Sequence, residues 1–298
     1  MSGRLYRVFV LLALIVAGCG RPVGPPIPWL TPTAGPAPVP TLTPPQPTAT
    51  PTTALPIAGN VLEERYYACE IGGQTVGYFH QRLLKGDAAA LHAESRFLLQ
   101  TELQGKAQTL QWDAVTEMDA AYRPLAYRAV VQQGEAKTEV DAAFLNGEAK
   151  VTVSQRETRQ EKSVSLPGEF FLLDNNIFDH YAYLARRMEM EPGQREVSLF
   201  VPQAASVLTV TATLAEGSEP LALAGKEYSA RALTLNGPFA GMTIWLTEAG
   251  ELLQVDIPAQ NTVIRLADRD IVGRLNTLDM FSFLLETKFT RSNVQFTG

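Results

Sequence analysis

The sequence is poor in cysteine and histidine, the residues that form disulfides, zinc sites and many catalytic centres. Its 298 residues include two cysteines, Cys19 and Cys69, and three histidines, His80, His92 and His180. None of them falls in a Cys-x-x-Cys or His-x-x-x-His spacing, so we expect no metal and no cofactor. A Gly-x-Ser-x-Gly elbow and a glycine-rich phosphate loop are missing too, which argues against the enzyme classes that use them.

The charge balance argues against a nucleic-acid partner. Three arginines are the only charged residues before position 60, so residues 60–298 carry 22 basic and 31 acidic side chains, a formal net charge of −9. No basic stripe with interleaved aromatic residues stands out in that region. We therefore expect no nucleic-acid binding. Anionic lipid headgroups also repel an acidic domain of this kind.

The first residues have the parts of a bacterial export signal. Arg4 and Arg7 make a positive start, and residues 8–17 are an apolar run of ten residues. This run is too short to cross a bilayer as a helix. We therefore predict that residues 1–18 are a signal peptide. The motif Val16-Ala17-Gly18-Cys19 resembles the lipobox of bacterial lipoproteins, a family whose cysteine is diacylated and becomes the first residue after cleavage.

The lipobox resemblance implies lipidation of Cys19 and a membrane partner. The protein is then exported and held by lipid on the outer face of the bacterial cell membrane, or on the outer membrane if the cell has one. Acyl chains anchor a protein because each buried CH₂ adds about 0.8 kcal/mol. An ordinary signal peptide with a chance cysteine is the alternative.

A proline-rich stretch, residues 19–59, follows the signal. Gly20 to Ala58 contains 13 of the 20 prolines, eight threonines and one charged residue, Arg21. This composition buries too little apolar surface to fold, so we predict a disordered tether that holds the next domain away from the membrane. Fully extended, it reaches on the order of 100 Å. A docking site for a proline-binding partner is the alternative.

Residues 60–275 alternate apolar and polar side chains as β-strands do. The clearest run places one set of residues on a single face: Leu110, Trp112, Ala114, Thr116 and Met118. Similar runs cover residues 125–131, 140–144, 151–153, 197–201, 207–214, 228–235, 242–247, 252–257 and 263–266. The pair Asn146-Gly147 between two such runs is a strong hairpin signal. About a dozen strands with short connections predict a mainly β fold with a long antiparallel meander.

One amphipathic helix, residues 176–190, interrupts the strands. Asn176 is a candidate N-cap and Pro192-Gly193 ends the helical pattern. The apolar residues of the segment form one stripe: Ile177, Tyr181, Leu184 and Met188. Because this stripe must be buried, we expect the meander to curl into a half-barrel around the helix.

The order of many strands, one helix and further strands resembles uncharacterised bacterial envelope proteins whose folds are related to the lipoprotein carriers LolA and LolB. The segments that carry this resemblance are 118–127, 173–176, 180–181 and 248–253. It implies a concave apolar surface that holds acyl chains. Residues expected at the strand–helix interface would then contact the ligand: Trp112, Met118, Phe178, Tyr181 and Leu184. A structural or adaptor domain that binds another envelope protein is the alternative.

The C-terminal segment, residues 276–298, is rich in aromatic residues. Thr277 begins a pattern that predicts a helix, with Leu278, Phe281 and Leu285 on one face. The segment either packs against the sheet, covers a cavity mouth or binds a partner. In the adaptor alternative, the partner-binding residues are Phe281, Phe283 and Phe289.

Two further groups are candidates for reactivity. Asp179 and His180 are the densest polar pair, but adjacent residues on a helix point about 100° apart, so Asp179 is not placed to orient His180 as a general base. We expect His180 to be a cap or surface residue and the protein not to be an enzyme. Cys69 lies in a strand-like run and is expected to be a small buried hydrophobe, with a reactive thiol as the alternative.

Overall fold

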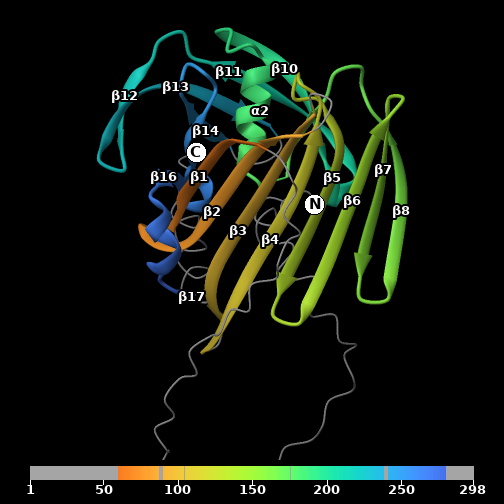
Figure 1. Ribbon diagram of the computed structural model, residues 1–298, viewed down its shortest axis with the longest axis horizontal. Helices are drawn as coiled ribbons and strands as arrows, with labels where there is room; N and C mark the ends of the chain where they lie inside the picture. Colours follow the sequence, from red (N-terminus) through yellow and green to blue (C-terminus); the bar gives the residue numbers. More distant parts are fainter. Residues whose placement is uncertain (1–59, 87–89, 104, 175, 238–240, 280–298) are drawn as a thin grey trace, which may run out of the picture.

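The computed structural model describes residues 60–86, 90–103, 105–174, 176–237 and 241–279 (Figure 1). The first half of the described chain is a meander of eight strands: β1 (Asn60–Ile71), β2 (Gln74–Lys85), β3 (Leu91–Leu103), β4 (Lys106–Met118), β5 (Pro124–Gln133), β6 (Ala136–Leu145), β7 (Glu148–Gln155) and β8 (Thr158–Ser165). Each strand pairs antiparallel with the next.

The second half contains one α-helix and nine strands: β9 (Phe171–Leu172), α2 (Asp179–Arg187), β10 (Gly193–Val201), β11 (Ser206–Leu214), β12 (Glu219–Leu223), β13 (Lys226–Asn236), β14 (Met242–Leu246), β15 (Leu252–Ile257), β16 (Thr262–Ala267) and β17 (Leu278–Asp279). Short 3-10 turns connect some of them: η3 (Pro202–Ala204), η4 (Pro258–Gln260) and η5 (Arg269–Gly273). The predicted mainly β fold with a long antiparallel sheet is confirmed.

The two halves form one continuous sheet because the first strand pairs on both sides. β1 lies between β2 and β16, with Tyr67 opposite Leu266. From β16 the ladder continues through β15, β14, β13 and β11 to β10. β9 adds to β10 in parallel, β12 extends β13, and β17 pairs in parallel with the end of β3.

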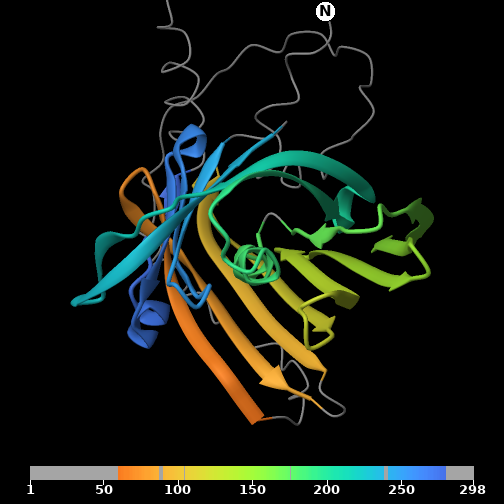
Figure 2. The ribbon, with the colours of Figure 1, turned by 90° about the horizontal axis from the view of Figure 1, so that it is seen from above.

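The sheet curls around helix α2 without closing into a barrel (Figures 1 and 2). β8 lies at one end of the ladder and β9, paired to β10, at the other. Among the described residues, β8 pairs with β7 and β9 with β10, and no backbone ladder joins β8 to β9 or β10. We call this gap between β8 on one side and β9 and β10 on the other the seam.

Helix α2 fills the concave side, and its predicted apolar stripe is confirmed: Ile177, Tyr181, Leu184 and Met188 are all at most 3% exposed. The predicted bounds were too wide. The helix begins at Asp179, and the N-cap position is Phe178 rather than Asn176. It ends at Arg187, because Glu189 and Met190 adopt left-handed φ angles of 57° and 51° that an α-helix cannot continue.

The inner face of β4 confirms its alternation, since the residues from Leu110 to Met118 that were predicted to share a face are buried. The Asn146-Gly147 hairpin is confirmed as well, with φ of 55° and 74° as a type I′ turn requires. The alternation of residues 125–131 predicts that Leu125 shares a face with the buried Tyr127, but Leu125 is 46% exposed, because a register shift beside Met118 turns the start of β5.

Several sequence predictions fall outside the described residues. The signal peptide, Cys19 and the tether lie in residues 1–59, and Phe281, Phe283 and Phe289 lie beyond Asp279. The helix expected to begin at Thr277 is wrong at its start, because Leu278 and Asp279 pair with β3 as strand β17. None of the helices that the structure describes is long and apolar enough to span a membrane.

Candidate functional site

The start of helix α2 is surrounded by buried polar side chains. His180 is 2% exposed, so it is not a surface residue, although it accepts a local hydrogen bond from the loop before the helix. Its Nδ1 accepts the backbone N–H of Asp174 at 3.0 Å, which places the ring hydrogen on Nε2, 3.0 Å from Thr116 Oγ1. Burial lowers the pKa of His180 to about 3. The imidazole is therefore neutral near pH 7, with both nitrogens engaged.

The Asp174 carboxylate organises the loop that leads into the helix. Its Oδ1 accepts the backbone N–H of Asn176 at 3.0 Å, and its Oδ2 accepts hydrogen bonds from the Tyr127 hydroxyl and the Gln203 amide. Burial raises the pKa of Asp174, and these donors act in the opposite direction. The network thus ties α2 to β5 and to the η3 turn.

Asp179 is fully buried and has different partners from its neighbour His180. Its Oδ2 accepts hydrogen bonds from Ser95 Oγ at 2.8 Å and from the Tyr183 hydroxyl at 3.0 Å. Its Oδ1 has no partner among the described residues. Burial raises the pKa of Asp179 to about 6, while both donors lower it. The carboxylate therefore holds β3 and the helix together rather than orienting the imidazole.

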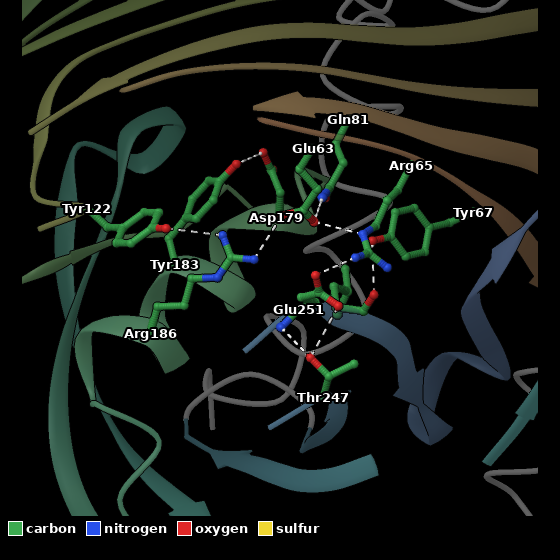
Figure 3. Close-up of polar contacts among 11 residues, drawn as sticks. Glu63, Arg65, Tyr67, Gln81, Tyr122, Asp179, Tyr183, Arg186, Thr247 and Glu251 are labelled. Carbon is green, nitrogen blue, oxygen red and sulfur yellow. Dashed lines mark hydrogen bonds and ion pairs between the residues drawn. The ribbon is translucent and has the colours of Figure 1, made fainter. Parts of the chain in front are cut away.

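A half-buried ion-pair network continues from Asp179 along the helix (Figure 3). Glu63 accepts hydrogen bonds from Arg65 and Gln81 on Oε1 and from Arg186 on Oε2, each at 2.9 Å. Arg65 also pairs with Glu251 at 2.7 Å. Strands β1, β2 and the β14–β15 turn are thereby linked to the last turn of α2. The side chains of Glu63 and Arg186 are only 11% and 12% exposed.

A small cleft lies beside this polar region. Its walls come from β4, β5, β9 and the helix, and it has room for about one water molecule. The residues that line it are Thr116, Met118, Tyr122, Pro124, Phe171, Leu172, His180, Tyr183, Leu184 and Arg187. Two of the predicted ligand-binding residues, Met118 and Leu184, are thus at the cleft.

The aromatic interior lies on the other side of the helix start. Phe178 makes edge contacts with Phe79 and Phe97, at ring-centroid distances of 5.3 and 5.6 Å. Phe97 in turn lies 5.6 Å from Trp112, and Phe178 lies 6.4 Å from Tyr181. We call the cluster formed by Phe79, Phe97, Trp112, Phe178 and Tyr181 the aromatic interior. It contains no charged side chain.

The five predicted ligand-binding residues are therefore divided. Trp112, Phe178, Tyr181 and Leu184 belong to the main core, and Met118 belongs to a smaller cluster with Leu83, Leu91, Ala93 and Tyr183. All five are at most 3% exposed. Cys69 is confirmed as a buried small hydrophobe at 1% exposure, and burial raises the pKa of its thiol.

Sequence reasoning missed most of the polar partners. Three of these partners lie in segments far from the helix in the sequence, and nothing in their local pattern indicates burial: Ser95, Gln203 and Glu63. Among the described residues, no group of three or more His, Cys, Asp or Glu side chains is arranged to hold a metal ion.

No family model matches the sequence, and no curated protein matches it. Among solved structures, the chain is similar to a beta-barrel-like protein of a domain of unknown function, DUF1849, from Brucella abortus. The TM-score is 0.48 and the identity 13%, over 70% of this chain and 96% of that one.

Proposed function

We propose that the protein is a membrane-anchored lipoprotein of the cell envelope, whose domain binds an apolar ligand such as a lipid or acyl chain. The anchor part of this proposal rests on the lipobox at Cys19, and the localisation follows from it. The ligand part rests on one observation in the fold: the apolar concave side of the sheet is bounded by a seam that no backbone ladder closes.

The contacts across the seam are few and come from side chains. Lys162 on β8 donates a hydrogen bond from Nζ to the carbonyl oxygen of Ala205 at 2.8 Å. Phe144 on β6 packs edge-on against Phe200 on β10, with ring centroids 5.5 Å apart. Parting these groups breaks side-chain contacts but no row of backbone hydrogen bonds. The seam is therefore the entrance through which we expect an apolar chain to reach the interior.

We also propose that the domain is not an enzyme. The strongest catalytic candidate, His180, is neutral and uses both ring nitrogens within the fold. A general base needs a nitrogen within reach of a substrate proton, and a nucleophile needs such a base beside it. The polar network around Asp174 and His180 fits the positioning of helix α2 better than acid–base chemistry.

The ligand proposal is tested by photolabelling. The full-length protein in membranes is treated with a diazirine analogue of methyl palmitate, irradiated, digested and analysed by mass spectrometry. We expect labels on peptides from β4 and α2, and their loss when excess unlabelled methyl palmitate competes. Labels that resist competition or fall only on surface strands would reject the ligand, leaving the structural or adaptor domain that binds another envelope protein.

The anchor is tested separately with the Cys19→Ser variant. The wild-type protein is expected to partition into detergent and to carry the added mass of its acyl chains. The variant is expected to partition into the aqueous phase without that mass. Equal masses and equal partitioning of the two forms would show that the lipobox reading is wrong.

A further inference from the structure

Two hydrogen-bond donors in the aromatic interior have no partner in the part of the chain that the structure describes. Trp112 is 0% exposed and Tyr181 is 1% exposed. Neither the indole Nε1 of Trp112 nor the hydroxyl of Tyr181 has a hydrogen-bond partner among those residues. A buried donor without a partner costs about 1–3 kcal/mol, and most buried polar atoms in folded proteins are paired. Two such donors in one ring cluster therefore need a physical explanation.

Comparable residues elsewhere in the described domain are paired. The buried Tyr67 hydroxyl donates to the carbonyl oxygen of Leu252 at 3.1 Å. Tyr127 and Tyr183 donate to the carboxylates of Asp174 and Asp179. Trp245 donates from its indole nitrogen to Asp256 at 2.7 Å. This sheet thus supplies acceptors for the other buried phenols and for its second indole.

The two unpaired donors belong to the same cluster. Phe97 lies 5.6 Å from Trp112 on one side and 5.6 Å from Phe178 on the other, and Phe178 lies 6.4 Å from Tyr181. The rings around both residues are therefore aromatic, and the Asp174 carboxylate also acts on the Tyr181 hydroxyl. We expect an apolar chain that enters here to bury its methylene groups against these rings, and an oxygen atom on that chain to accept from N–H and O–H groups that lack acceptors.

We infer that Trp112 and Tyr181 donate hydrogen bonds to the carbonyl oxygen of an uncharged acyl group, an ester or amide, on the ligand of this domain. This inference deepens the proposed function and rests on it. It adds a substrate class: the ligand is an esterified or amide-linked acyl chain, such as a glycerolipid or an acylated peptide, rather than a plain hydrocarbon or a free fatty-acid carboxylate.

The electrostatics of the interior favour an uncharged acceptor. No basic side chain belongs to the aromatic interior, and the nearby arginine Arg186 is already paired with Glu63 at 2.9 Å. The charges that face Tyr181 are negative: burial raises the pKa of its hydroxyl, and the Asp174 carboxylate raises it further. The hydroxyl therefore stays protonated as a donor. A carboxylate would be desolvated here without a cation, which is strongly unfavourable.

The test uses Tyr181→Phe, which removes only the hydroxyl, with Tyr67→Phe as the matched control whose hydroxyl is paired. The full chain carries Cys19→Ser, so that its own anchor lipids are absent. Methyl palmitate, palmitate and hexadecane compete against a fluorescent acyl ester. We expect methyl palmitate to compete best and Tyr181→Phe to lose about five- to tenfold of its affinity for the ester, in line with one hydrogen bond. Hexadecane should compete against the fluorescent ester equally well for both variants.

A second readout needs no ligand. Without an added ligand, Tyr181→Phe should unfold at the same urea concentration as its parent or a higher one, because it removes an unpaired buried hydroxyl. Tyr67→Phe should unfold at a lower concentration, because the Leu252 carbonyl loses its donor. Trp112→Phe removes the second donor. It should also lower the affinity for the ester but not the affinity for hexadecane.

The outcomes separate the inference from the proposed function. Equal competition by ester and hexadecane, or an unchanged ester affinity in Tyr181→Phe, would overturn the inference while leaving an apolar ligand site in place. Equal destabilisation of Tyr181→Phe and Tyr67→Phe would also overturn it, since the hydroxyl would then be paired, for example to a buried water. If none of the three probes binds, the proposed function falls and the inference falls with it.

Discussion

His180 and Tyr181 are adjacent on helix α2 and equally buried, yet the fold treats their polar atoms in opposite ways. Each ring nitrogen of His180 has a partner within 3.0 Å, whereas the hydroxyl of Tyr181 has none. The difference shows that burial alone does not distinguish a structural polar residue from one that faces a ligand. Hydrogen-bond partners do: among the described residues, both ring nitrogens of His180 are paired within the fold, and the hydroxyl of Tyr181 is not.

The largest expected effect comes from breaking the Glu63 ion-pair network. Glu63→Ala leaves Arg186 buried without a counter-charge and also removes the acceptor of Arg65 and Gln81. Removing one partner of a buried ion pair costs about 3–5 kcal/mol. Urea unfolding followed by circular dichroism measures this loss.

The matched control for Glu63 is Glu161, which pairs with Arg159 at 2.8 Å, but both side chains are 67% exposed. Glu161→Ala should change the unfolding free energy by less than about 1 kcal/mol. Similar losses for the two variants would contradict the view that the Glu63 network fastens the helix to the sheet.

A smaller effect of up to about 3 kcal/mol is expected from titration of Asp179. Its pKa is raised from 3.8 to about 6 by burial, so its contribution to stability is full below pH 3.8 and is lost as pH rises to about 6. His180 has the opposite sign: its pKa is lowered from 6.5 to about 3, so its contribution is full above pH 6.5 and is lost as pH falls.

These two slopes oppose each other between about pH 4 and pH 6, and Asp179→Asn removes one of them. The variant should therefore lose stability more steeply than the wild-type protein as pH falls from 7 to 4. Urea midpoints measured across this range test the expectation. Parallel pH profiles for the two proteins would show that the Asp179 carboxyl does not titrate with a raised pKa.

Tyr127→Phe should cost about 1.5–3 kcal/mol, because Tyr127 donates to the buried Asp174 carboxylate. Thermal unfolding of this variant beside Tyr181→Phe compares a paired and an unpaired buried hydroxyl. Equal melting temperatures for the two variants would remove the contrast on which the comparison rests.

The smallest change in stability is expected at the seam. Lys162→Met removes the hydrogen bond to the Ala205 carbonyl, which is worth about 0.5–1.5 kcal/mol or less. If ligands pass through the seam, the variant should release a fluorescent acyl ester faster while binding it about equally well. Stopped-flow release rates measure this, with Lys150→Met on the neighbouring strand β7 as the control. Identical release rates would place the entrance elsewhere.

Much of the fold was readable from the sequence because its signals are local. The alternation from Leu110 to Met118 and the stripe from Ile177 to Met188 depend only on the period of a strand and of a helix. Strand β8 was missed because most of its residues are exposed, which leaves no apolar alternation to detect. Leu125 was misplaced because a bulge reverses the face of a strand, and its position depends on the partner strand.

The candidate site was only partly readable. Trp112 and Tyr181 were named from the sequence because large apolar residues at a strand–helix interface are expected to be buried. That their N–H and O–H groups lack acceptors depends on every neighbour in three dimensions. The polar partners of the helix are equally non-local, since Ser95 and Asp179 are 84 positions apart and Glu63 and Arg186 are 123 apart. No local pattern encodes such pairs.

The position of β1 between β2 and β16 has a consequence for the order in which the chain folds. Tyr67 finds its partner Leu266 only after almost the entire domain has been synthesised. Until then, one edge of the first strand exposes unpaired backbone groups, which other chains can pair with. Closing such a long loop is slow. A chain that leaves the ribosome or crosses a membrane from its N-terminus therefore needs protection at β1 for most of that passage, and a chaperone that covers this edge would raise the yield of folded protein.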